Sequence, residues 1–135
     1  MKLQFLDSNI ILRHFLRDVP TQSKAATAYL SSVEKGEVDV RIADTVIFEV
    51  VFTLERTYGY SKAKIREGLL PLISLPGIML PGKRRIKQAL DLYVNLNLPF
   101  ADAYYAVRME KLKINEIVSF DRHFDRIPGV RRVKP

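Results

Sequence analysis

Short apolar runs alternate along the chain with longer segments whose apolar residues recur at helical spacing. The runs predict strands over residues 3–6, 38–43, 78–80, 114–120 and 130–133. The periodic segments predict helices that begin at Ile10 and extend over about 22–35, 45–58, 62–75, 83–95 and 101–112. Asp44 or Thr45 is expected to cap the helix that ends near residue 58, and Ser61 the next one. No repeat or flexible linker divides the 135 residues. The alternation therefore predicts a single α/β domain, with a mostly parallel sheet of four or five strands flanked by helices.

Two acids stand directly at the ends of predicted strands. Asp7 follows the first strand and precedes a helix, and Asp121 follows the strand over residues 114–120. Functional groups in open α/β sheets gather at the carboxyl ends of strands, so both acids are candidates for a shared site. The alternative is helix capping, because aspartate also favours the residue before a helix.

Two further acids occur among small or apolar residues of predicted helices. Glu49 lies within the apolar segment 46–52, so we expect its side chain to be buried or to face a cleft. A buried structural pair with an arginine is the alternative. Asp102 lies in the first turn of its helix between Ala101 and Ala103, which leave room beside the acid. Interaction with the helix dipole, typically ~0.3–1 kcal/mol, would also explain an acid there.

A cluster of these four acids would need a cation. Unit charges of like sign ~4 Å apart repel by about 4 kcal/mol at an effective dielectric near 20. Oxygen ligands without cysteine favour Mg²⁺ or Mn²⁺. His14 and His123 lie among apolar and basic residues, and we interpret both as packing or surface residues rather than ligands.

The charge and composition narrow the class of partner. Lysine and arginine outnumber aspartate and glutamate by 22 to 15, a formal charge of +7. That balance favours nucleic acid, although a solvated basic surface would give the same number. Phosphate-binding glycine loops, a signal peptide and a membrane-spanning run are not recognisable in the sequence, and cysteine is absent. We therefore expect a cytoplasmic protein that binds no membrane.

Four segments together resemble a known family. FLDSN near the start, the acid in FEV, PFADAYYA and IVSFDRHFDRIPGV are similar, in order and spacing, to PIN domains, and above all to VapC-type toxins of toxin–antitoxin pairs. The resemblance implies an α/β/α sandwich and a ribonuclease that depends on Mg²⁺ or Mn²⁺. It also implies an antitoxin partner and a homodimer. The positions that match the catalytic and metal-binding acids are Asp7, Glu49, Asp102 and Asp121, with Asn9 and Ser119 as supporting polar residues.

The RNA substrate would need positive charge beside the acids, for which the best candidates are Arg13, Arg122 and Arg126. Alternatives to a toxin are a PIN-domain RNA-processing nuclease without an antitoxin and a catalytically inactive RNA-binding module. A receiver-like signalling domain also places acids at strand ends, but it would need an acid pair near the first strand, where Asp7-Ser8-Asn9 supplies one acid.

Overall fold

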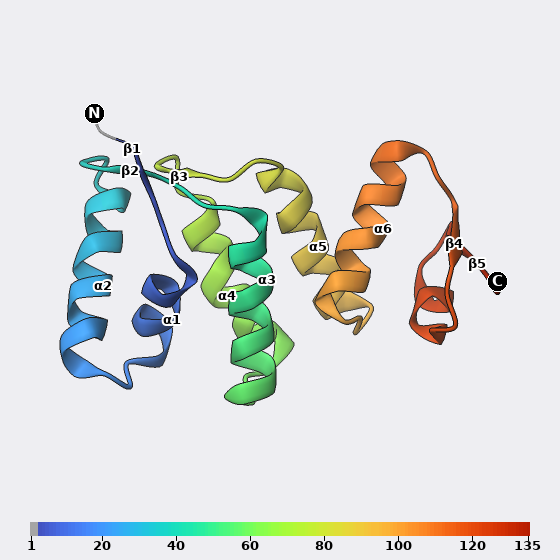
Figure 1. The fold of residues 1–135 in the computed structure, drawn as a ribbon, viewed down its shortest axis with the longest axis horizontal. Helices are drawn as coiled ribbons and strands as arrows, with labels where there is room; N and C mark the ends of the chain where they lie inside the picture. The colour runs from blue at the N-terminus through green and yellow to red at the C-terminus, as the bar shows by residue number, and fades with distance from the viewer. Residues whose placement is uncertain (1–2) are drawn as a thin grey trace. The chain divides into compact units, whose positions relative to one another are not determined.

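The computed structural model describes residues 3–135, which form two compact units (Figure 1). The first unit ends at Lys83 and the second spans Arg84–Pro135. Helical segments connect successive strands in both units, and every strand pairing in the described residues is parallel. The α/β class predicted from the sequence is therefore confirmed. Among the described helices, none combines the length and the apolar character needed to cross a bilayer.

The first unit is built around a three-stranded parallel sheet. Its strands β1 (Leu3–Phe5), β2 (Asp39–Arg41) and β3 (Ile78–Met79) lie in the order β1-β2-β3. The helices are α1 (Ser8–Leu16), α2 (Pro20–Glu34), α3 (Asp44–Phe52) and α4 (Lys62–Ile73), and a π-helical turn (Thr53–Thr57) continues α3. Helix α1 packs against both α2 and α3.

Apolar residues of the central strand and the facing helices form the core of this unit. Val40 on β2 and Ile42 just after it are fully buried, as central parallel strands require. Helix α3 contributes its buried face, and α1 contributes Ile11. The chain leaves β1 at Asp7 and enters α1 at once, so this acid lies at the carboxyl end of a strand, as predicted.

The second unit places two helices before a short parallel strand pair. Helix α5 (Lys83–Asn95), whose first residue belongs to the first unit, is followed by α6 (Phe100–Leu112), β4 (Glu116–Val118), a 3₁₀ turn (Arg122–Arg126) and β5 (Arg131–Val133). The rings of Tyr93 and Phe100 pack edge to face, with centroids 5.7 Å apart, between the two helices. Backbone hydrogen bonds beyond the strand ends, including Ser119 N–H to the Val133 carbonyl, hold the β4–β5 connection.

Several expected boundaries and caps differ from those observed. The strands are shorter than predicted, and the described strands form one three-stranded and one two-stranded sheet rather than one continuous ladder. Ser61 caps α4 as expected, accepting a hydrogen bond from the Lys64 N–H at 3.2 Å. The predicted cap at Asp44 or Thr45 is wrong. Ala43 occupies the capping position and supplies no side-chain hydrogen bond, and the Asp44 carboxylate accepts from the adjacent Thr45 N–H.

Candidate metal site

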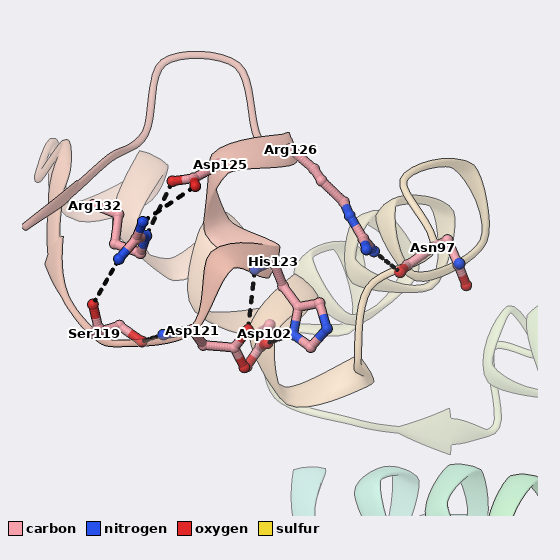
Figure 2. A network of polar contacts seen from close by, with 8 residues as sticks. All are labelled: Asn97, Asp102, Ser119, Asp121, His123, Asp125, Arg126 and Arg132. Carbon is pink, nitrogen blue, oxygen red and sulfur yellow. Dashed lines mark hydrogen bonds and ion pairs between the residues drawn. The ribbon is translucent and has the colours of Figure 1, made fainter.

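Two acids and a histidine of the second unit converge on one point (Figure 2). The His123 Nδ1 atom lies 2.6 Å from Oδ1 of Asp121 and 3.5 Å from Oδ2 of Asp102. One potential ligand atom from each residue lies within 4.8 Å of the others. The structure therefore brings together two of the four predicted acids. It adds His123, which the sequence analysis interprets as a packing or surface residue.

Asp102 and Asp121 reach this point from different elements. Asp102 lies in the first turn of α6, where its side chain is 13% exposed. Asp121 follows β4 and opens the 3₁₀ turn, and its Oδ1 accepts a hydrogen bond from the His123 N–H at 3.0 Å. The capping role considered for Asp121 is thus real, and the same hydrogen bond fixes its carboxylate beside Asp102.

A second layer of hydrogen bonds holds this turn in place (Figure 2). The Asp121 N–H donates to Oγ of Ser119 at 2.9 Å, so the predicted supporting residue does contact the acid. Arg132 on β5 donates to both carboxylate oxygens of Asp125, at 3.0 and 3.3 Å, and to the Ser119 carbonyl at 3.4 Å. A bidentate arginine–carboxylate pair of this kind fixes geometry as well as charge.

Hydrogen bonding favours the ionised form of two acids in the turn, Asp121 and Asp125. The backbone hydrogen bond from His123 lowers the pKa of Asp121, and the side chain of His123 acts in the same direction. The hydrogen bonds from Arg132 likewise lower the pKa of Asp125. Ionised carboxylates are the protonation state that binds a metal ion.

The donor set fits a divalent cation. Oδ2 of Asp102 and Nδ1 of His123 are both buried atoms that face the same point, and Asp121 contributes a second carboxylate. Carboxylate oxygens suit Mg²⁺ and Mn²⁺, while imidazole nitrogen suits first-row transition metals. These three residues could hold such an ion.

The remaining predicted acids belong to the first unit. Asp7 occupies the capping position of α1, but its carboxylate makes no capping hydrogen bond to the helix. The Ser8 hydroxyl donates to it at 3.4 Å instead. Asp7 and Asn9 line a cavity of about 700 Å³ together with β1 and α2 residues. Helix capping therefore does not account for this acid, because the hydrogen bond that defines a capping side chain is missing.

Glu49 meets one of the two environments expected for it at most. Its side chain is exposed on α3, so burial is wrong, and a position facing a cleft stays a prediction. The residues of α3 that pack inward are Val46, Ile47, Val50 and Val51, which share one face of the helix. Glu49 lies outside that face, as does Phe52, which is 64% exposed. That all four acids form one site remains a prediction, because Asp7 and Glu49 lie in one unit and Asp102 and Asp121 in the other.

The three arginines proposed for RNA binding have different surroundings. Arg13 forms an ion pair with Asp18 at 2.5 Å and donates to Oδ1 of Asn9 at 3.2 Å. Arg126 donates to the carbonyl of Asn97 at 2.6 Å (Figure 2). Arg122 is exposed on the 3₁₀ turn next to Asp121.

Residues 5–130 match the model of the PIN domain family. The chain belongs to the PIN domain family. The match covers both units and includes all four predicted acids of this PIN domain. The PIN chain is also similar to a curated protein named VapC ribonuclease from Aquifex aeolicus (strain VF5). The two are 25% identical over 133 residues, which cover 98% of this chain and 97% of that protein.

Proposed function

We propose that this PIN domain is a metal-dependent endoribonuclease that hydrolyses phosphodiester bonds in RNA. The observation that carries the proposal is the convergence of Asp102, Asp121 and His123 on one point within a domain of this family. The similar Aquifex protein is named a ribonuclease, and the formal charge of +7 suits a polyanionic substrate.

We further propose that Asp7 and Glu49 serve the same metal site as Asp102 and Asp121. The carboxylate of Asp7 follows a strand directly and does not cap its helix, and Glu49 is solvent-exposed on α3. A helix cap therefore does not explain Asp7, and a buried ion pair does not explain Glu49. Asn9 and Ser119 would support the acids' geometry, as Ser119 does through its hydrogen bond to the Asp121 N–H.

The proposed roles differ between the acids, which would bind the metal ion, and the arginines, which would bind RNA. The ionised carboxylates would hold Mg²⁺ or Mn²⁺, which would supply a more acidic water molecule and positive charge beside the phosphate. Arg122, exposed beside the fourth acid, provides positive charge for a substrate phosphate. Arg13 and Arg126 already bind protein groups, Asp18 and the Asn97 carbonyl, so each would have to contact RNA in addition to that partner or in place of it.

We also propose that the protein is the toxin of a type II toxin–antitoxin pair and acts in the cytoplasm as a homodimer. The support is the similarity to a protein named VapC ribonuclease. Phe52 and Tyr58, at the end of α3 and after its π-helical turn, are 64% and 43% exposed and would be buried in the dimer. Light scattering should then find a dimer that Phe52→Asp converts to a monomer. A PIN nuclease without an antitoxin would lack a neighbouring gene for a small DNA-binding protein.

The deciding experiment is cleavage of single-stranded RNA by the purified protein with Mg²⁺, with Mn²⁺ and with EDTA. We expect cleavage only with a metal ion, and loss of cleavage in Asp7→Asn and in Asp102→Asn. Glu110→Gln, an exposed acid on the same helix as Asp102, is the matched control and should cut normally. Wild-type rates in both asparagine variants would refute the site, and cleavage in EDTA would refute the metal requirement.

A further inference from the structure

His123 is the residue of the cluster that the four-acid site does not explain. Its imidazole has two carboxylates as neighbours, Asp121 at 2.6 Å and Asp102 at 3.5 Å from the same nitrogen, Nδ1. Here Nδ1 points between two acids that come from separate elements, α6 and the turn after β4 (Figure 2).

The distances suit three ligands of one ion. Ligands at right angles around an ion ~2.1 Å away lie about 3 Å from each other. The two distances from Nδ1 bracket that value, and all three ligand atoms fall within 4.8 Å.

The backbone of His123 is held firmly enough to direct its ring. Its N–H donates to the Asp121 carboxylate at 3.0 Å. The next residue, Phe124, is buried, and Arg132 holds Asp125 one residue further on. Ligand residues fixed by such contacts on both sides lose little freedom when a metal ion binds.

We propose that His123 is a nitrogen ligand, through Nδ1, of the divalent ion held by Asp102 and Asp121. The inference rests on the proposed metal site and adds a residue to it. Imidazole binds first-row transition metals better than it binds Mg²⁺, which prefers an all-oxygen shell. His123 therefore shifts the preference of the site from Mg²⁺ toward Mn²⁺.

The test is electron spin-echo spectroscopy of the full-length protein loaded with Mn²⁺, which detects a coordinated imidazole nitrogen directly. We expect a ¹⁴N coupling in the wild type and in His14→Gln, and its loss in His123→Gln. The chain has two histidines, so ¹⁵N-histidine labelling of His14→Gln assigns the signal to His123 even if His123→Gln fails to fold. Absence of a nitrogen coupling in the loaded wild type would overturn the proposal.

Titration gives a second readout that does not depend on catalysis. His123→Gln should bind Mn²⁺ about tenfold or more weakly, with a smaller change for Mg²⁺. Equal weakening of both ions would mean that His123 only positions the carboxylates, and would also overturn the proposal. The ribonuclease proposal can fail separately, because Mn²⁺ could bind with a nitrogen coupling while RNA stays uncut. Conversely, RNA cleavage without a nitrogen coupling would leave the ribonuclease intact and remove His123 from the metal.

Discussion

The two histidines have different surroundings, a helix interface for His14 and a pair of carboxylates for His123. The Nδ1 atom of His14, on α1, is hydrogen-bonded to the Thr27 hydroxyl on α2 at 2.8 Å. The His14 ring lies beside the ring of Phe15. The Nδ1 atom of His123 faces two carboxylates, those of Asp102 and Asp121. Burial, with the charge of Arg17, lowers the pKa of His14, so its environment favours a neutral ring. Two residues of the same type, each between an arginine and a phenylalanine, thus lie at a helix interface in one unit and beside two carboxylates in the other.

The largest difference between the two regions should appear in RNA cleavage. Asp102→Asn removes one negative charge from the cluster around His123 and should reduce cleavage to background. Its melting temperature in metal-free buffer should not fall, because repulsion with Asp121 is relieved. Thr27→Val, the counterpart beside His14, should cleave RNA at the wild-type rate. If Thr27→Val were the inactive variant, the roles assigned to the two regions would have to be exchanged.

A smaller effect is expected from the arginine that supports the turn. Arg132→Met removes the paired hydrogen bonds to Asp125 and the contact with the Ser119 carbonyl. Cleavage should fall partially, and amide hydrogen exchange should speed up over residues 119–123 while the α1–α2 region keeps its rates. Arg132→Lys should recover only part of the loss, since lysine cannot form the bidentate pair. Unchanged exchange over 119–123 would show that the turn holds itself without Arg132.

Arg122 tests whether RNA contacts a positive charge beside the candidate metal site. Arg122→Gln leaves the acids and His123 in place but removes an exposed positive charge beside Asp121. We expect a higher KM with little change in kcat, and a salt dependence of RNA binding that is weaker by about one ion. Arg17→Gln, an exposed arginine beside His14, is the control. An equal effect of both changes would mean that RNA contacts a general basic surface.

Much of the fold could be predicted from the sequence, but the decisive part of the candidate site could not. Helix α5 has its predicted bounds because Ile86, Leu90 and Tyr93 recur at helical spacing and are buried. The expected burial of Glu49 failed because an apolar segment does not show which face of its helix meets the core. His123 was overlooked because its contact with Asp102 depends on a turn that periodicity does not encode.

The smallest predicted effect concerns stability and pH in the region of His14. The pKa of His14 in the folded protein lies below its ordinary value of 6.5. As the pH falls, the unfolded chain therefore takes up a proton at His14 at a higher pH than the folded protein does. The free energy of unfolding should therefore decrease as pH falls from 6.5 through the folded pKa, and this contribution is fully present above 6.5. His14→Gln keeps a hydrogen-bonding group near Thr27 but cannot titrate there. Its melting temperature should fall less than that of the wild type between about pH 7.5 and pH 5. Parallel curves would mean that α1 and α2 accept a charged ring between them, and the distinction between the two histidines would then rest on His123 alone.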